Sequence, residues 1–404
     1  MQLSPKAQEL LASAAERIER YRKADCTIRL LDARGRPVRN RTVQVEMTRH
    51  AFLFGANIFP LFEFDEKQHE TYGQRFRALF NYATLAFYWG AYEPEPGRKT
   101  GRDQQKRIAE WCKRHGIETK GHPLVWHEVY PRWASNDPDA VKPLLEARVR
   151  EIVREFRGLI ERWDVINEAT VGHRYENGVG KWLVRDGAVK VVTETLNWAR
   201  AAHPKAFLLY NDYNISPEFE RLVEALVKSN ASLDAIGIQS HMHTGDWTLE
   251  RVWEVCETYA RFGKPLHFTE VTVLSGQHGW ERPRPWRSTP EGEARQADYV
   301  EWFYTLLFSH PAVEAITWWD LADAYAWQGA PAGLLREDLN PKPAYERLRK
   351  LIREQWWTPL QTLTTDSQGV ARFRGYLGAY RITVDAKTHM FELKRGKNAV
   401  RMRL

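Results

Sequence analysis

The fold of this chain is decided by the stretch Arg162-Trp163-Asp164-Val165-Ile166-Asn167-Glu168, a short and largely apolar run that ends in a carboxylate. His267-Phe268-Thr269-Glu270-Val271 repeats the pattern later in the chain. Apolar runs of this length are typical of strands that are buried on both faces, as in a parallel sheet. A charged side chain at the end of such a strand costs free energy to bury, so it indicates a function. The alternative for either glutamate is an ion-paired structural residue.

Outward from these two runs, similar apolar segments alternate with amphipathic helical stretches. The predicted strands are residues 53–57, 81–87, 118–125, 162–167, 206–211, 235–239, 266–270 and 315–319. Eight such units are what a (β/α)8 barrel requires. A doubly wound open sheet is the alternative, but it usually has a Gly-rich phosphate loop after its first strand, and this sequence has none there. In a barrel the carboxyl ends of the strands meet at one mouth, so Glu168 and Glu270 are expected to face each other.

The two ends of the chain have a different pattern. Residues 1–23 predict a helix, with Ser4 as its cap and Pro5 at its first position. Residues 27–31 and 42–47 lie on either side of a turn signal and predict a hairpin. Further short strands are predicted at 370–373, 380–384, 390–393 and 400–404, with glycines between them.

Neither terminal segment alone has enough strands for an independent sandwich of sheets. We therefore expect residues 24–50 plus 356–404 to join in a small, discontinuous, β-sandwich-like domain. Residues 51–355 are expected to form the barrel, and the length of 404 residues fits a barrel with one small module.

Composition and charge limit the classes of partner that we expect for this chain. Lys and Arg number 59 against 52 for Asp and Glu, but the basic residues are scattered among acidic ones, so nucleic-acid binding is not expected. No stretch has the length and apolarity of a membrane span, and the N-terminus lacks the apolar core of a signal peptide. We expect a cytoplasmic protein unless a leader has been removed. Cys26, Cys112 and Cys256 have no CxxC spacing and predict neither a disulfide framework nor a zinc site.

Six motifs at the predicted strand ends resemble, in order, those of glycoside hydrolase family 10, the retaining endo-β-1,4-xylanases. They are GHPLVWH at 121–127, WDVINE at 163–168, YNDYN at 210–214, GIQSH at 237–241, TE at 269–270 and the segment 317–327. Residues 334–345 also resemble the segment that closes the barrel in that family. The resemblance implies a (β/α)8 fold, hydrolysis without a cofactor, and a polysaccharide substrate, either xylan or a related β-glycan.

The resemblance also implies that Glu168 is the general acid/base and Glu270 the nucleophile of a double displacement. The chemistry of glycoside hydrolysis agrees with two carboxyl groups. One must protonate the leaving oxygen, while the other meets the positive charge that develops at the sugar carbon. Glu168 must be protonated when substrate binds and ionised once the covalent intermediate has formed. We therefore expect a raised pKa for Glu168.

Other positions are assigned to substrate binding by the same resemblance. Asn167 would bond the sugar 2-hydroxyl, and His241 would bond the nucleophile with Gln239 beside it. The remaining expected sugar contacts are His122, Trp126, Tyr213, Trp319 and Trp327. Of these, His122 and Trp126 would line the subsite just before the scissile bond, and Trp319 and Trp327 would form a wall of the cleft.

Three further residues have plainer interpretations. His241-Met242-His243 suggests a metal site, but no third ligand stands at a convincing spacing, so we expect no metal. Trp318 points away from Trp319 on an alternating strand and is interpreted as packing. His127 is interpreted as structural.

Two positions depart from the family pattern. After the second strand the family usually has a Glu-Asn pair followed by Lys, which hold the glycone hydroxyls, whereas this chain has ATLAFYWG at 83–90. Sugar hydroxyls buried without partners should cost glycone affinity. Either Tyr88 and Trp89 bind a differently decorated sugar, or the important contacts lie on the aglycone side. Asp320 stands where the family usually has Gly, which would place a new carboxylate near the cleft.

These departures leave three hypotheses. The first is a retaining endo-β-1,4-xylanase-like hydrolase. The second keeps the mechanism and changes the substrate to another, or a substituted, β-glycan. The third is a carbohydrate-binding protein without turnover. The presence of both glutamates with Asn167 and His241 argues against the third hypothesis, because a pure binder needs no protonatable pair.

Overall fold

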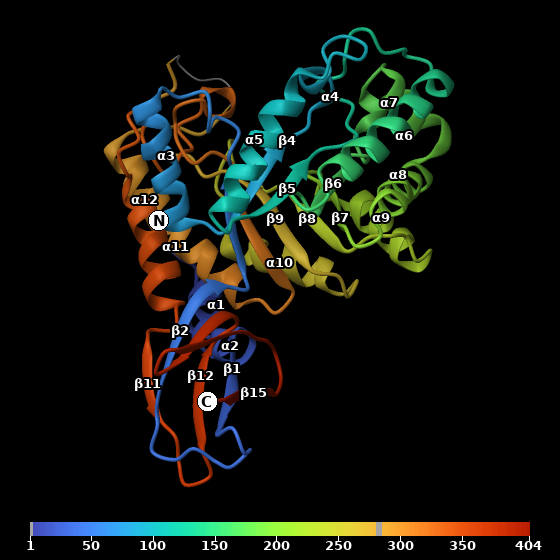
Figure 1. The fold of residues 1–404 in the computed structure, drawn as a ribbon. Helices are drawn as coiled ribbons and strands as arrows, with labels where there is room; N and C mark the ends of the chain where they lie inside the picture. The colour runs from blue at the N-terminus through green and yellow to red at the C-terminus, as the bar shows by residue number, and fades with distance from the viewer. Residues whose placement is uncertain (1–2, 280–284) are drawn as a thin grey trace.

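The computed structural model describes residues 3–279 and 285–404, and its largest unit is a closed barrel of eight parallel strands (Figure 1). The order around the ring is β10-β3-β4-β5-β6-β7-β8-β9. The strands are β3 (Leu53–Asn57), β4 (Tyr82–Ala86), β5 (Glu118–His122), β6 (Arg162–Asn167), β7 (Phe207–Asp212), β8 (Ala235–Ile238), β9 (Leu266–Val271) and β10 (Val313–Trp318). The predicted (β/α)8 fold is confirmed.

Helices connect the strands on the outside of the ring, because parallel neighbours need a crossover. They are α3 (Glu66–Leu79), α4 (Trp89–Tyr92), α5 (Thr100–Arg114), α6 (Pro138–Glu155), α7 (Gly178–Asp186), α8 (Ala188–Ala202), α9 (Pro217–Lys228), α10 (Leu249–Ala260), α11 (Pro290–Ser309) and α12 (Pro343–Lys350), with short helices η1 (Gly172–Arg174), η2 (Trp327–Gly329) and η3 (Leu351–Gln355). In α9 the buried side chains are Phe219, Leu222, Val223 and Leu226, the spacing of one helical face. In the part of the chain that the structure describes, no helix has the length and apolarity to span a membrane.

The N-terminal helix is divided into two. α1 (Pro5–Ala12) and α2 (Ala14–Arg22) replace the single predicted helix, and Ser13 stands between them. The Ser13 hydroxyl donates to the carbonyls of Glu9 and Leu10. Serine side chains that bond to the preceding turn compete with the helical backbone pattern and favour a break or a bend. The predicted cap is present, because the Ser4 hydroxyl oxygen accepts from the backbone N–H of Ala7.

Outside the barrel, the described residues form two sheets from the two ends of the chain (Figure 1). One sheet has the order β12-β1-β15 and the other β11-β2-β13-β14. The strands are β1 (Lys23–Leu31), β2 (Thr42–His50), β11 (Gln361–Thr364), β12 (Val370–Tyr376), β13 (Gly378–Val384), β14 (Lys387–Leu393) and β15 (Asn398–Arg403). The accessory β-domain formed by both termini is confirmed. We propose 24–50 plus 356–404 as its boundaries, with 51–355 as the barrel.

The predicted hairpin is wrong, because β1 and β2 belong to different sheets. The turn itself exists: the Asp32 carboxylate accepts from the backbone N–H groups of Arg34 and Arg36. It only begins the connection, which continues to Thr42. Both strands bury alternate residues, so each presents one apolar face to the interior between the sheets. The alternating pattern does not distinguish strands that pair from strands that face each other.

The accessory domain and the helix α2 before it both meet the barrel at the amino ends of its strands. Arg49 of β2 forms an ion pair with Glu118, the first residue of β5. Arg22, which is buried, donates to the carbonyls of Phe308, His310 and Val313, just before and at the start of β10. The carboxyl ends, where the two glutamates lie, are at the opposite end of the barrel, so the accessory domain does not line the mouth.

We expect Arg22→Met to lower the free energy of unfolding by about 2 to 3 kcal/mol, because buried carbonyls would lose their charged donor. Urea unfolding followed by circular dichroism measures the change. Arg20→Met is the matched control, since Arg20 is exposed on the same helix and its loss should change the stability by less than about 0.5 kcal/mol. Equal effects of the two substitutions would contradict an anchoring role for Arg22.

Candidate active site

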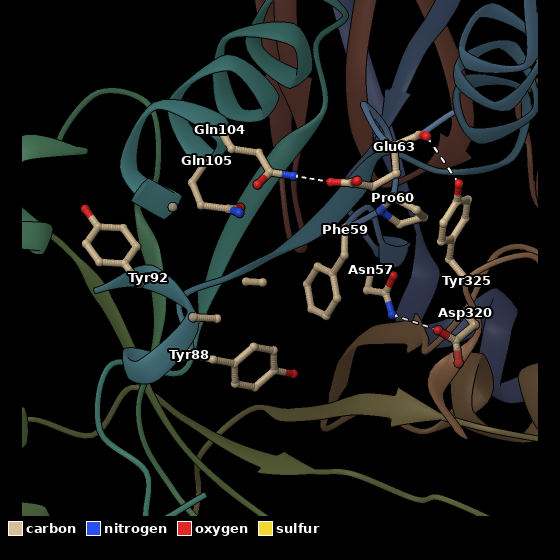
Figure 2. Close-up of a pocket in the computed structure, with 13 residues that line it drawn as sticks. Asn57, Phe59, Pro60, Glu63, Tyr88, Tyr92, Gln104, Gln105, Asp320 and Tyr325 are labelled. Carbon is tan, nitrogen blue, oxygen red and sulfur yellow. Dashed lines mark hydrogen bonds between the residues drawn. The ribbon is translucent and has the colours of Figure 1, made fainter. Parts of the chain in front are cut away.

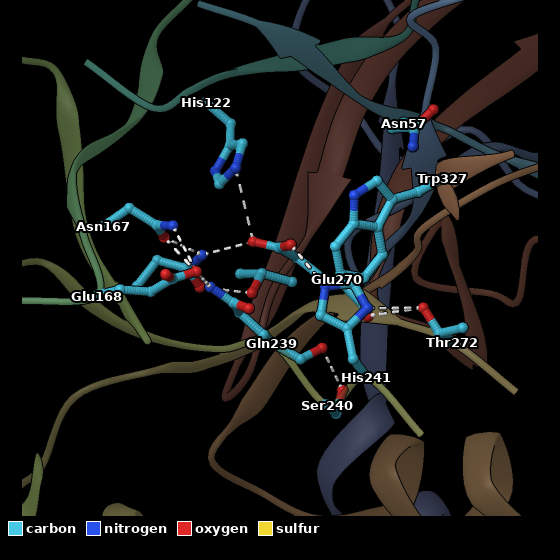
Figure 3. Close-up of polar contacts among 12 residues, drawn as sticks. Asn57, His122, Asn167, Glu168, Gln239, Ser240, His241, Glu270, Thr272 and Trp327 are labelled. Atoms are coloured by element: carbon cyan, nitrogen blue, oxygen red, sulfur yellow. Dashed lines mark hydrogen bonds and ion pairs between the residues drawn. The ribbon is translucent and has the colours of Figure 1, made fainter. Parts of the chain in front are cut away.

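Two glutamates lie buried at the mouth of the barrel (Figure 3). Glu168 directly follows β6 and is 6% exposed, and Glu270 is the second-last residue of β9 and is 3% exposed. The backbone φ of Glu168 is +56°, in the left-handed region that non-glycine residues seldom adopt. Its N–H donates to the Asn211 carbonyl at 2.9 Å, which holds this conformation against β7. Backbone strain of this kind is typical of functional sites.

The Glu168 carboxyl group is surrounded by three donors. Its Oε1 accepts from Gln239 Nε2 at 2.7 Å and from Asn167 Nδ2 at 2.9 Å, and its Oε2 accepts from Trp126 Nε1 at 3.0 Å. These bonds favour the ionised form, but burial outweighs them and, with the nearby charge of Glu270, raises the pKa of Glu168 to about 8. At neutral pH the group is therefore mainly protonated.

The Glu270 carboxyl group has the opposite balance. Burial alone would raise its pKa, but the imidazoles of His122 and His241 outweigh burial and lower the pKa below its usual value. His241 Nε2 donates to Glu270 Oε2 at 3.0 Å while its Nδ1 lies 2.8 Å from Thr272 Oγ1. His122 Nε2 lies 3.7 Å from Glu270 Oε1. Glu270 is therefore ionised at neutral pH, and neighbouring carboxyl groups with separated pKa values can act as an acid and a nucleophile.

A buried ion pair supports His122 from inside the barrel. Asp164 Oδ2 accepts from His122 Nδ1 at 2.8 Å and lies 2.6 Å from Lys120 Nζ. Lys120 and Asp164 are both fully buried. Burial opposes the charge of Asp164, but Lys120 and His122 hold its pKa below the usual value. This bond fixes Nδ1 of His122 as a donor and directs Nε2 towards Glu270.

Side-chain amides connect the two carboxyl groups. Asn211 Nδ2 donates to Glu270 Oε1 at 2.7 Å and to Asn167 Oδ1 at 2.8 Å. Thr269 Oγ1 donates to Asn211 Oδ1, which fixes the orientation of that amide. A Cβ atom at Gly237 would lie 2.5 Å from Asn211 Oδ1, so glycine is required beside it. Asn167 and Gln239 complete the connection through their bonds to Glu168.

Aromatic side chains surround this polar centre. The Trp319 ring is buried and lies 5.5 Å from both the His122 and the Phe59 rings. Trp327 is 43% exposed, with its ring centred 4.8 Å from that of His241. Tyr88 lies 5.6 Å from the His122 ring and from the Trp126 ring.

The structure brings most of the residues that we expect to contact sugar together around the two glutamates. Tyr213 and Trp89 are the two exceptions. Tyr213 lies further out, 42% exposed, and its hydroxyl accepts from Arg174 Nη1. Trp89 is buried against Tyr130 and Trp133, and its indole N–H donates to Glu93. Trp89 is therefore part of the packing of the loop after β4, and the structure does not bring it to the two carboxyl groups.

Sequence reasoning did not assign Asn211, Lys120 or Asp164 to the site. Asn211 had a signal, because it lies in one of the six motifs at a strand end. Lys120 and Asp164 had one too, as charged residues inside predicted buried strands. Asp320 is buried beside the cleft. Its Oδ1 accepts from Asn57 Nδ2 at 3.3 Å and its Oδ2 from the Trp327 backbone N–H at 3.2 Å, while burial raises its pKa to about 7.

Among the described residues, one group of side chains has a geometry that could hold a metal ion. It consists of His127, Glu128 and Glu168. Glu128 is exposed and accepts a hydrogen bond from the Tyr175 hydroxyl, and Glu168 already accepts three bonds. The suggested pair His241 and His243 is less suited, because both ring nitrogens of His241 are engaged by Glu270 and Thr272.

A (β/α)8 barrel with two buried, differently shifted carboxyl groups at its mouth has the equipment of a glycoside hydrolase. Residues 47–351, about three quarters of the chain, match the family model described as Glycosyl hydrolase family 10. The chain belongs to this family.

Individual relatives agree with this placement. Anti-sigma-I factor RsgI6 of Acetivibrio thermocellus is 29% identical over 382 residues, which cover 92% of this chain and 46% of that protein. The chain thus spans less than half the length of this relative, and the likeness extends beyond the barrel into the terminal segments. Endo-1,4-beta-xylanase B of Thermotoga neapolitana is 28% identical over 286 residues, 66% of this chain and 78% of that protein.

A solved structure shows the same fold. Xylanase 10B from Thermotoga petrophila RKU-1, in complex with xylobiose, superposes with a TM-score of 0.64 at 24% identity, and covers 76% of this chain and 95% of that chain.

We expect Asp164→Asn to lower the free energy of unfolding by about 3 to 5 kcal/mol, because it leaves the Lys120 ammonium buried without a counter-charge. Urea unfolding at neutral pH measures the loss. Asp385→Asn is the control, because its ion pair with Arg41 is about half exposed and should contribute no more than about 1 kcal/mol. A loss as small as that of the control would contradict a stabilising role for the buried pair of Lys120 and Asp164.

Proposed function

We propose that this protein is a retaining endo-β-1,4-xylanase-like hydrolase that cleaves internal linkages of xylan by double displacement. The observation that carries the proposal is the opposite shift of two neighbouring carboxyl groups. Glu168 is held protonated and Glu270 is held ionised at the mouth of a family 10 barrel. Membership of a family that includes named xylanases supports the choice of substrate.

In the first step, Glu270 attacks the anomeric carbon and the carbon–oxygen bond to the leaving sugar breaks. Glu168 transfers its proton to the departing oxygen, so the leaving sugar is released as a neutral alcohol. Asn211 and His241 hold the two oxygens of Glu270 in place and keep the attacking carboxylate oriented. Asn167, next to Glu168, would bond the sugar 2-hydroxyl, a contact that strengthens in the transition state.

In the second step, water attacks the anomeric carbon of the glycosyl ester and Glu270 leaves as a carboxylate. Glu168, now ionised, accepts the proton from that water. Glu168 changes from acid to base because the charge next to it changes. The charge of Glu270 raises the pKa of Glu168 in the free enzyme, and this charge is absent while the ester exists. The pKa of Glu168 therefore falls when a base is needed.

A second candidate keeps this mechanism on a different or substituted β-glycan. It is favoured by the segment ATLAFYWG at 83–90, in β4 and just after it, which lacks the polar groups that hold glycone hydroxyls in the family. A third candidate is a carbohydrate-binding protein without turnover. One relative is named as an anti-sigma-I factor and not as a xylanase. The separated pKa values of the two glutamates support a catalyst instead, since binding alone does not require them.

We expect wild-type protein to release xylo-oligosaccharides from glucuronoxylan or arabinoxylan, and Glu270→Ala to lower the rate by at least about 10³-fold because no nucleophile remains. Chromatography that resolves chain lengths measures the products, with mixed-linkage glucan and cellulose in the same panel. Glu314→Ala is the control, an exposed glutamate at the other end of a barrel strand. Full turnover by a folded Glu270→Ala protein would overturn the proposal, and products only from another glycan would favour the second candidate.

Glu168→Ala should separate the two steps. We expect polysaccharide hydrolysis to fall by about 10² to 10⁴-fold, because the leaving sugar needs a proton. An aryl glycoside with a good leaving group needs little acid assistance, so its first turnover should persist as a burst of aryl alcohol equal to the enzyme concentration. Stopped-flow absorbance measures the burst. Equal loss on both substrate types would contradict the acid role of Glu168.

The dependence of kcat/KM on pH should be bell-shaped. Activity requires Glu168 protonated and Glu270 ionised, so the rate should fall about tenfold per pH unit above about pH 8 and should also fall below the lowered pKa of Glu270. The alkaline limb should vanish for aryl glycosylation by Glu168→Ala. An unchanged alkaline limb in this variant would assign that limb to another group.

A further inference from the structure

A side pocket opens next to the catalytic centre, with a volume of about 280 Å³ (Figure 2). Its walls come from the end of β3 and the segment after it, the end of β4, α4, the start of α5, and the residues Asp320 and Tyr325 after β10. Figure 2 shows Phe59 and Tyr88 in its middle, with Gln105 on one side and Asn57 and Asp320 on the other.

The pocket occupies the place where the chain departs from its family. Ala86 is the last residue of β4 and Ala91 lies in α4, and both line the pocket with single methyl groups. The family usually has long polar side chains in this segment, which reads ATLAFYWG in this chain. Small side chains in place of large ones leave a cavity unless the backbone collapses, and here the space persists.

The pocket is continuous with the cleft through shared aromatic walls. Tyr88 lines the pocket, and its ring lies 5.6 Å from those of His122 and Trp126. Phe59 lines it too, 5.5 Å from the Trp319 ring. A sugar that contacts His122 and Trp126 would therefore have the pocket at its side, on the glycone side of the two glutamates.

Polar groups inside the pocket are placed to receive a ligand. Gln105 is 6% exposed, and its Oε1 has no hydrogen-bond partner. Buried acceptors are nearly always paired in folded proteins, so this oxygen marks a place for a donor from a ligand or a water molecule. On the other side of the pocket, the buried Asp320 carboxyl group accepts a hydrogen bond from the buried Asn57 side chain. The oxygens of both side chains have lone pairs left that can accept further hydrogen bonds.

The charges of the residues that line the pocket exclude anionic ligands. It contains the carboxyl groups of Glu63 and Asp320, and none of the described residues that line it is Lys, Arg or His. A carboxylate or sulfate would be buried there without a counter-charge, at a high cost. The aromatic rings and hydrogen-bonding groups instead suit a neutral sugar, which has apolar ring faces and hydroxyl edges. The volume corresponds to about nine water molecules at roughly 30 Å³ each, enough for one monosaccharide unit.

We propose that this pocket binds a neutral monosaccharide side group on the glycone part of the substrate, with Gln105 and Asp320 as its hydrogen-bond partners and Tyr88 as its aromatic wall. This inference rests on the proposed function. It adds that the chain prefers a substituted polysaccharide and discriminates against acidic side groups such as uronates.

Three oligosaccharides of equal backbone length test the proposal: linear xylotetraose, xylotetraose with one arabinofuranosyl side group, and xylotetraose with one glucuronosyl side group. We expect the arabinosylated chain to have the highest kcat/KM, at least about tenfold above the glucuronosylated chain. Ala86→Leu would fill the pocket and should lower the ratio of arabinosylated to linear kcat/KM about tenfold. Ala201→Leu, on the exposed surface of α8, is the matched control and should leave that ratio unchanged.

Gln105→Leu provides a second test that does not depend on the folding of Ala86→Leu. It keeps the volume and removes the acceptor, so the same ratio should fall about fivefold. A linear chain cleaved as well as or better than the arabinosylated one, or a ratio that neither substitution changes, would overturn the inference while leaving the proposed function intact. If the wild type cleaves none of the three, the proposed function fails. Calorimetric binding of the same three compounds then decides: preference for the arabinosylated chain, lost in Ala86→Leu, supports the pocket, and equal binding overturns it.

Discussion

The removal of two carboxyl groups from water at one end of a closed barrel is the constraint on which the rest of the site depends. Each group is expensive to bury, and the cost is met in opposite ways. Glu168 is surrounded by neutral donors and burial keeps its proton on. Glu270 has His122 and His241 next to it, and they keep its charge. The two groups differ because residues from different strands supply unequal surroundings to chemically identical side chains.

A buried ion pair inside the barrel, beneath the two glutamates, supports the difference between their surroundings. Lys120 and Asp164 form an ion pair with no exposure to solvent, and Asp164 holds His122 through Nδ1. A buried pair of this kind adds little to stability compared with an apolar pair of the same size. Its effect is to fix the orientation of a histidine that faces Glu270. The barrel interior beneath the site thus contributes to the electrostatics of the site, and packing is only part of its function.

Sequence patterns could predict the parts of this structure that depend on local periodicity. The barrel strands and the places of Glu168 and Glu270 follow from apolar runs with charged ends. The connection between β1 and β2 did not follow, because alternation reveals one buried face and not which sheet a strand joins. Asn211 was missed because its contacts to Asn167 and Glu270 arise from three strands brought together by ring closure. The left-handed backbone at Glu168 likewise has no sequence signal, since glutamate seldom adopts it.

The groups that surround the two glutamates and the residues that line the side pocket come from different parts of the strand ring. The groups that hold Glu168 and Glu270 come from β5 to β9, where the chain keeps the family motifs. The side pocket lies between β3, β4 and the end of β10, where the chain departs from them. The hydrogen bonds to the two carboxyl groups do not involve Ala86 or Gln105, so substitutions at these two positions leave those bonds in place. A barrel mouth built from separate strand ends permits this independence, because each strand end can change its side chain while the ring remains closed.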